Sequence, residues 1–138
     1  MGPETPQFAM RYSAAWAAHD PDAIVAMHTD DTVFHMHDVA EAATGRPAVR
    51  AAIDLLFQES PDLSFEPRRV HFGDDHFVSE YVVSGTASGK PFACDGVDVF
   101  TLRDGLVARK DTYIDWLAYQ QQVGAGEAAT TVSERSDP

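Results

Sequence analysis

The stretch CDGVDVFTL at residues 94–102, followed by RDG at 103–105 and LVARKDTYIDW at 106–116, decides the fold of this chain. In the first run, β-branched residues alternate with other types up to an Asp-Gly turn signal, a pattern that predicts a β-hairpin. Successive side chains of a strand point to opposite faces, so Asp98 shares a face with its second neighbours along the strand. A carboxylate at such a position is either partly exposed to solvent or buried because it has a specific role. The surroundings of Asp98 are therefore the central question that this sequence poses.

The size and composition are those of one globular domain. The chain has 138 residues, of which 44% are hydrophobic and 23% charged, and this is long enough to bury a core. A formal net charge of -12 with only 10 Lys and Arg residues argues against nucleic acid and membrane surfaces as partners. The single cysteine, Cys94, excludes an internal disulfide, and no apolar run approaches the roughly 18 residues that span a bilayer. We therefore expect a soluble, cytoplasmic protein.

The order of the predicted elements is helices first and strands after them. Apolar periodicity predicts helices over 5–19, 21–28, 48–58 and 116–123, and strands over 32–38, 63–72 and 76–86 before the hairpin. Asp20 is expected to cap the second helix, with His28 on the inner face of that helix. This order predicts an α+β domain over residues 1–123, in which three N-terminal helices cover a curved, cone-shaped, mainly antiparallel sheet and enclose a pocket. Residues 124–138 have little to bury and are predicted to be a disordered tail.

Several short segments strengthen this expectation. Taken in chain order, they resemble the SnoaL-like branch of the nuclear-transport-factor-2-like superfamily over roughly residues 7 to 123. The segments are Trp16 with HDPDA at 19–23, DD at 30–31, GR at 45–46, RDG at 103–105 and YID at 113–115. The resemblance implies a cone-shaped α+β barrel that is commonly a homodimer through its outer sheet face and holds a small ligand. It implies fold more than function, because members include isomerases, cyclases, epoxide hydrolases, dehydratases and noncatalytic binding subunits.

One enzyme pattern of the superfamily matches in part. Ketosteroid isomerases pair a helix tyrosine with a protonated aspartic acid on a late strand, and use an aspartate on the first strand as base. The stretch KPFACDGVDV at 90–99 resembles the late-strand pattern with Asp98 as the acid, and Tyr12 corresponds to the tyrosine. Met36 stands at the position of the base. The resemblance therefore implies an oxyanion site without the usual base.

Two other patterns match less well. Epoxide hydrolases of the limonene type keep charged residues on a middle strand, where this chain has YVV at 81–83, and an aspartate on the last strand, where it has Thr112. SnoaL-type polyketide cyclases also keep an aspartate at the position of Thr112. Asp111 is adjacent, but one residue along a strand is the opposite face, so only a bulge would bring it inward.

The residues suggest a catalytic site with alternatives that remain open. If Asp98 faces the pocket, desolvation favours its protonated form, and Asp98 and Tyr12 would together donate hydrogen bonds to a developing oxyanion. Alternatively, Asp98 pairs with Lys110 on the neighbouring strand and does no chemistry. Asp38 or His37 is the candidate for a displaced base. The predicted pocket lining is Trp16, His28, Met36, Ile53, Tyr81, Val83, Thr112 and Ile114.

His35 and His37 are two residues apart on a predicted strand, so they point the same way at a spacing that suits a metal. The spacing is similar to the start of a cupin motif, but the glycine and the later parts of that motif are missing. We therefore expect these histidines on the face away from the pocket, and no metal.

Two functions follow from these observations. The preferred prediction is a small enzyme without a cofactor that transfers protons on an apolar, ring-bearing substrate with a carbonyl or enol, by isomerisation, aldol-type cyclisation or dehydration. The alternative is a noncatalytic binding or accessory dimer that uses the same pocket for a ligand. Met36 and Thr112 stand where the related enzyme patterns have acids, and this favours the noncatalytic function. The presence of Asp98 and Tyr12 favours the enzyme.

Overall fold

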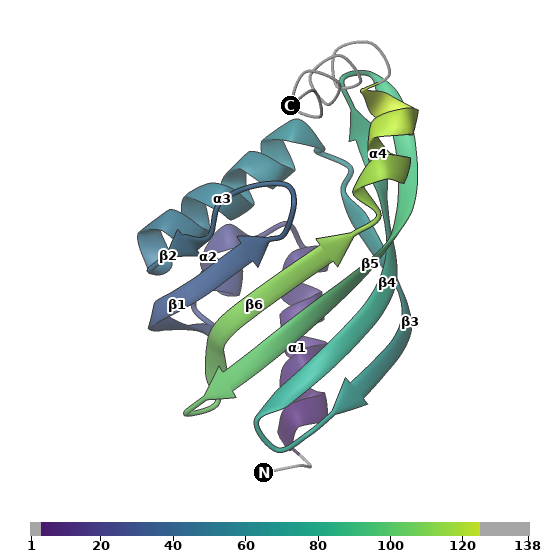
Figure 1. Cartoon of the computed structure of the whole chain (residues 1–138). Helices are drawn as coiled ribbons and strands as arrows, with labels where there is room; N and C mark the ends of the chain where they lie inside the picture. Colours follow the sequence, from purple (N-terminus) through teal and green to yellow (C-terminus); the bar gives the residue numbers. More distant parts are fainter. Residues whose placement is uncertain (1–3, 125–138) are drawn as a thin grey trace, which may run out of the picture.

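The computed structural model describes residues 4–124 (Figure 1). Six strands form one curved sheet in the order β2-β1-β6-β5-β4-β3. The strands are β1 (His28–Met36), β2 (Ala43–Thr44), β3 (Ser64–Phe72), β4 (His76–Ala87), β5 (Lys90–Arg103) and β6 (Leu106–Ile114), and the helices are α1 (Glu4–Ala17), α2 (Pro21–Val25), α3 (Arg46–Glu59) and α4 (Trp116–Val123). No described helix is long and apolar enough to cross a membrane.

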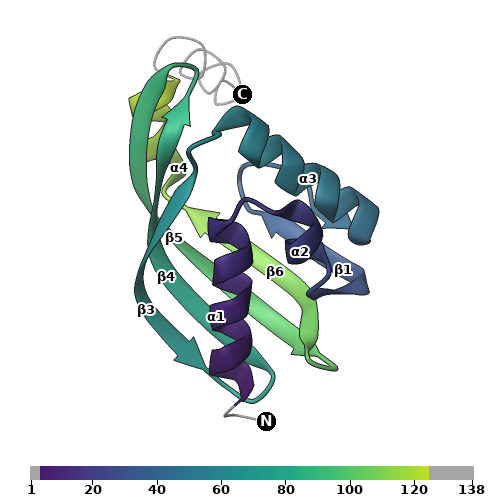
Figure 2. The ribbon, with the colours of Figure 1, turned by 180° about the vertical axis from the view of Figure 1, so that it is seen from behind.

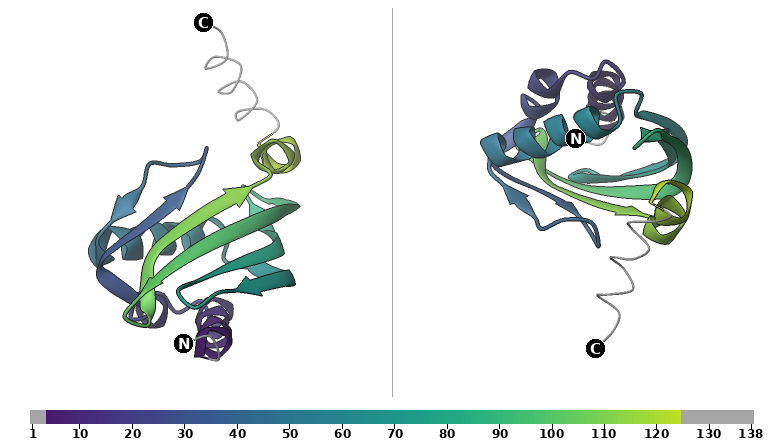
Figure 3. Two further views of the ribbon diagram at one scale, coloured as in Figure 1. Left: turned by 60° about the horizontal axis from the view of Figure 1, so that its bottom comes forward. Right: turned by 90° about the horizontal axis from the view of Figure 1, so that it is seen from above.

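The three N-terminal helices cover one face of the sheet, as Figure 2 shows from behind, and α4 follows β6 at one end of the molecule (Figure 3). The sheet curves around the helices without closing. The predicted α+β class, the mixed curved sheet and its helical cover are confirmed. The side chains between the two layers form the main core, with aromatic residues of α1 packed against Phe34, Phe77 and Phe100 of the sheet.

The central hairpin forms as the alternation predicts. In β5, every second residue from Phe92 to Phe100 is buried. At the turn, Asp104 and Gly105 both have positive φ angles, 55° and 75°, which are the angles that a two-residue hairpin turn requires. The ladder to β6 is regular from Phe100 opposite Lys110 to Gly96 opposite Ile114. Asp98 therefore lies directly opposite Thr112, and no bulge turns Asp111 inward.

The junction between α2 and β1 differs from the sequence prediction. Asp20 caps α2 by accepting a hydrogen bond from the Ala23 amide, as expected, but α2 ends at Val25 and His28 is the first residue of β1. The prediction that His28 lies on a helix is wrong, because the helix start is well marked and its end is not. β1 pairs with β6 in parallel, which places Phe34 beside Lys110 and Met36 beside Thr112. Apart from Gly124, the predicted tail lies outside the described residues.

Candidate functional site

A pocket of about 320 Å³ lies between the concave face of the sheet and helices α1, α3 and α4. This volume is in the range of small-molecule sites, and the walls are mostly apolar. Its lining residues include Trp16 of α1, Met36 of β1, Tyr81 of β4, Asp98 of β5, Lys110 and Thr112 of β6, and Trp116 and Tyr119 of α4.

Asp98 is the buried acid of this pocket, and it is only 7% exposed. Its Oδ1 accepts hydrogen bonds from the Tyr81 hydroxyl at 2.8 Å and from the Thr112 hydroxyl at 2.7 Å. The Lys110 Nζ lies 3.7 Å from Oδ2. All three neighbours are donors, so the carboxylate acts as an acceptor. The predicted pairing of Asp98 with Lys110 is therefore present, and both residues line the pocket.

Gly96 allows Tyr81 to reach Asp98. The two residues are opposite each other on β4 and β5, and a Cβ atom on Gly96 would stand 2.5 Å from the Tyr81 ring. The ring therefore occupies the space that a side chain at this position would fill. Burial, followed by the charge of Asp98, raises the pKa of Tyr81 above its ordinary value. Tyr81 is consequently a neutral hydrogen-bond donor at any physiological pH.

Lys110 is the unexpected member of the site, because it is buried to 4% exposure among aromatic rings. Its Nζ lies 4.0 Å from the ring centre of Trp16, 5.1 Å from that of Phe34 and 5.3 Å from that of Phe100. Phe34 and Phe100 are its register neighbours on β1 and β5, and Trp16 reaches it from α1. Burial lowers the pKa of the Lys110 ammonium, and the Asp98 carboxylate opposes that shift. Sequence reasoning considered Lys110 only as a structural partner, although its strand parity with Thr112 already placed it on the pocket face.

Tyr12, predicted to donate to an oxyanion together with Asp98, is not among the residues that line the pocket. Its hydroxyl lies 2.9 Å from His28 Nε2, and His28 Nδ1 lies 2.8 Å from the Thr32 hydroxyl. His28, predicted to line the pocket, is likewise not among its lining residues. Burial, followed by the charges of Lys110 and Arg46, lowers the pKa of His28 to about 3, so the ring is neutral at physiological pH.

The structure brings most of the other predicted lining residues together. Those that line the pocket are Trp16, Met36, Tyr81, Val83, Thr112 and Ile114. Ile53 does not line the pocket, because this residue of α3 is fully buried in the main core. Sequence reasoning missed the contribution of α4, whose Trp116 and Tyr119 stack at 4.9 Å between ring centres. The helix was predicted, but its short length gave no indication of which face turns inward.

Neither candidate for a displaced base reaches the pocket. His37 lies on the opposite face of the sheet, because its ring stacks on Tyr113 at 4.2 Å and its Nε2 lies 2.8 Å from Asp111 Oδ1. Asp38 is an exposed turn residue with a φ angle of 66°. The strand ends at Met36, and neither His37 nor Asp38 is among the residues that line the pocket.

On the outer face, the ligand atoms of His35, His37 and Asp111 lie within 4.8 Å of one another. Asp111 already accepts two hydrogen bonds from Arg109, at 2.8 Å and 3.0 Å. This cation neutralises the carboxylate that a metal would need, so we assign no metal to the cluster.

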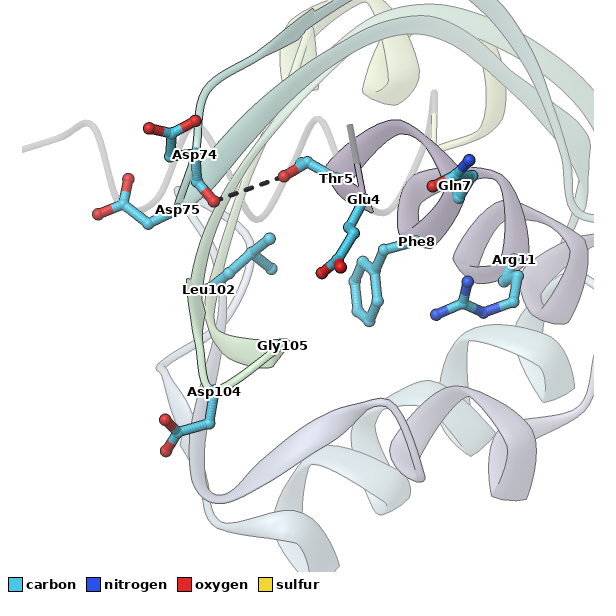
Figure 4. Close-up of a pocket in the computed structure, with 10 residues that line it drawn as sticks. All are labelled: Glu4, Thr5, Gln7, Phe8, Arg11, Asp74, Asp75, Leu102, Asp104 and Gly105. Carbon is cyan, nitrogen blue, oxygen red and sulfur yellow. Dashed lines mark hydrogen bonds between the residues drawn. The ribbon is translucent and has the colours of Figure 1, made fainter. Parts of the chain in front are cut away.

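A second pocket, of about 330 Å³, lies at the N-terminal end of α1, against the turns before β4 and before β6 (Figure 4). Acidic residues surround much of it, and the Thr5 hydroxyl donates to the Asp74 carbonyl at 3.4 Å. None of the residues predicted for the site lies there.

Comparison with known proteins agrees with this architecture. A family model described as the SnoaL-like domain matches residues 9–110. A protein of ketosteroid-isomerase-like fold from Catenulispora acidiphila, solved with trimethylamine, is 20% identical with a TM-score of 0.79; the match covers 86% of this chain and 93% of that one. A protein assigned as a SnoaL-like polyketide cyclase from Jannaschia sp. is 22% identical with a TM-score of 0.82, over 91% and 95% of the two chains.

A third structure, TerC co-crystallised with polyporic acid, is 16% identical with a TM-score of 0.74, over 84% of this chain and 95% of that one. At these identities the likeness shows the fold alone. No curated protein matches the sequence.

Proposed function

Because the chain belongs to the SnoaL-like domain family, we propose that it is a small enzyme that transfers protons, without a cofactor, on an apolar ring-bearing substrate with a carbonyl or enol group. One observation carries the proposal: a carboxylate and an amine, both nearly excluded from water, meet in the wall of an apolar pocket. Perturbed ionisable groups in a concave pocket are typical of catalytic sites. Similar structures that hold small molecules support the use of this pocket for a ligand.

The geometry suggests a role for each group. Asp98 would accept the proton from the carbon next to the carbonyl, since its surroundings make it an acceptor rather than the donor that the sequence predicts. Lys110 would stabilise the enolate oxygen, because an ammonium in a site of low dielectric acts strongly on a developing charge. The separation of 3.7 Å between Nζ and Oδ2 is longer than a tight ion pair, so both groups can contact a substrate.

The fate of the enolate then decides the reaction. Return of the proton at another carbon is an isomerisation, attack on a second carbonyl is an aldol-type cyclisation, and loss of a β-hydroxyl is a dehydration. In each case Asp98 carries one proton from the substrate and gives one back, so no oxidant or reductant is needed. Trp16, Met36 and the aromatic residues of α4 would hold the ring of the substrate.

The alternative function, a noncatalytic ligand-binding domain, rests on a separate observation. Two hydroxyl groups already bond to Asp98 Oδ1, and Met36 and Thr112 occupy pocket positions where related enzymes keep an acid. A pocket of this kind would bind a small apolar compound without changing it.

Solvent exchange distinguishes the two functions. In D₂O, the protein should accelerate the replacement of the acidic C1 protons of 2-tetralone, measured by proton NMR against a protein-free sample. Asp98→Asn should remove the acceleration. Asp95→Asn is the matched control, because Asp95 lies on the exposed face of the same strand. If 2-tetralone binds and the wild-type protein exchanges its protons no faster than buffer, the binding function is favoured instead.

A further inference from the structure

We propose that Lys110 is a nucleophilic amine that forms an imine with an aldehyde or ketone ligand in the pocket. This inference deepens the proposed function, since it gives the substrate carbonyl a covalent partner in the same site. It makes Lys110 more than a fixed positive charge.

The chain carries a natural comparison, because it has only two lysines. Lys90 begins β5 and is exposed. Lys110 is 4% exposed, and it contributes to the wall of the 320 Å³ pocket. An exposed lysine is protonated and well hydrated, and it is a poor nucleophile for that reason. A lysine in an apolar pocket loses that hydration, so its neutral amine becomes available for attack on a carbonyl.

The aromatic rings around Lys110 suit both the amine before it attacks and the iminium cation that forms afterwards. The faces of Trp16, Phe34 and Phe100 all lie within 5.3 Å of the Nζ. The centre of the Tyr12 ring also lies 5.2 Å from Nζ, and the Tyr12 hydroxyl contacts His28. The nearest carboxylate acceptor is Asp98 at 3.7 Å, which is longer than a strong hydrogen bond. The same faces stabilise a cation once it forms, including an iminium, through the charge distribution of the rings.

Asp98 supplies the proton transfers that imine formation needs. Its Oδ2 lies 3.7 Å from the Lys110 Nζ, and the two hydroxyl donors bond to the other carboxylate oxygen. It can accept the proton that Lys110 loses before attack. The C–N bond then forms and the carbonyl π pair moves to oxygen. That oxygen takes one proton from the nitrogen and a second from Asp98, and it leaves as water when the nitrogen pair forms the C=N bond. The lysine ammonium and the carbonyl thus give a protonated imine (an iminium) and water, with no oxidant or reductant.

An iminium would also make the proposed proton transfer easier. It withdraws electrons from the adjacent carbon more strongly than a carbonyl, and removal of a proton gives a neutral enamine. Asp98 is placed to take that proton after it has served in the dehydration step. The two acceptor roles follow each other in time and use the same oxygen.

Reductive trapping tests the inference. Wild-type protein near pH 7 is incubated with benzaldehyde and sodium cyanoborohydride, and peptide mass spectrometry measures benzylation of Lys110, Lys90 and the N-terminal amine. In the folded protein, Lys110 should react about tenfold or more faster than Lys90. Urea should remove this preference. Lys110→Arg should abolish the fast adduct, and Lys90→Arg should leave it unchanged.

The outcomes separate this inference from the proposed function. Labelling of Lys90 as fast as that of Lys110, in wild-type protein shown to be folded by circular dichroism, would overturn the imine. If 2-tetralone then still exchanges its protons in an Asp98-dependent way, proton transfer stands with Lys110 as an ammonium. Fast trapping at Lys110 without any exchange would support the imine site and contradict the proposed chemistry.

Discussion

Acidification should destabilise the fold through one buried histidine, His28. The pKa of His28 is about 3 in the folded protein, against about 6.5 in an unfolded chain. Below about pH 6.5 the unfolded state binds more protons at this position, so the contribution of neutral His28 to stability is complete above that pH and is lost as the pH falls towards 3. The linkage relation gives a loss of about 1 kcal/mol at pH 6 and about 2 kcal/mol at pH 5.

The physical cause is the set of partners that the neutral ring already has. Nε2 contacts the Tyr12 hydroxyl and Nδ1 contacts the Thr32 hydroxyl, and the ring has no exposed surface. A proton would place a second positive charge near Lys110 in a region without water. Protonation therefore favours unfolding.

Guanidinium chloride unfolding, followed by tryptophan fluorescence between about pH 7.5 and pH 5, measures the effect. His28→Gln keeps a polar side chain that does not titrate, so it should lower stability at every pH but show a flatter dependence. The slope of the difference between the two proteins isolates His28 from the other titrating groups. Parallel curves for the wild type and the variant would refute the reasoning, because they would mean that His28 titrates alike in the folded and unfolded states.

Two further predictions concern the acid and its neighbours. Gly96→Ala should displace the Tyr81 ring and break its hydrogen bond to Asp98. Urea unfolding should show a loss of about 1–3 kcal/mol of unfolding free energy. In a Tyr81→Ala background the same change should cost little, and an equal cost in both backgrounds would contradict the steric argument. Asp98→Asn should leave the Lys110 ammonium buried without its counter-charge, at a cost of about 3–5 kcal/mol, and adding Lys110→Met should recover a large part of that loss. Simple additivity of the two changes would show that the groups are not coupled.

Local patterns predicted the parts of the fold that local forces determine. Alternation and the Asp-Gly turn define β5 and β6, and the pocket face of Asp98 and of Lys110 follows from strand parity alone. The end of α2 was not predictable in the same way, since its five residues carry a strong start signal and no stop signal. His28 consequently lies at the start of a strand and not on the helix where the sequence placed it.

The composition of the site depends on packing between distant segments, and here the sequence was less informative. Nothing near Lys110 in the sequence indicates that Trp16 and Phe34 cover its amine. The assignment of Tyr12 as partner of Asp98 came from the resemblance to an isomerase pattern. In this chain the Tyr81 hydroxyl donates to Asp98 itself, and the absence of a side chain at Gly96 gives the Tyr81 ring room.

Because β1 pairs with β6, the cavity depends on segments from both halves of the chain. The hairpin of β5 and β6 carries both charged groups, but the rings that shield Lys110 come from α1 and β1, and α4 contributes another wall. The first and last described helices thus meet around one cavity. A fragment that lacked either end would keep the acid and the amine in register and expose them to water, so the cavity belongs to the intact polypeptide and cannot be transplanted as a hairpin.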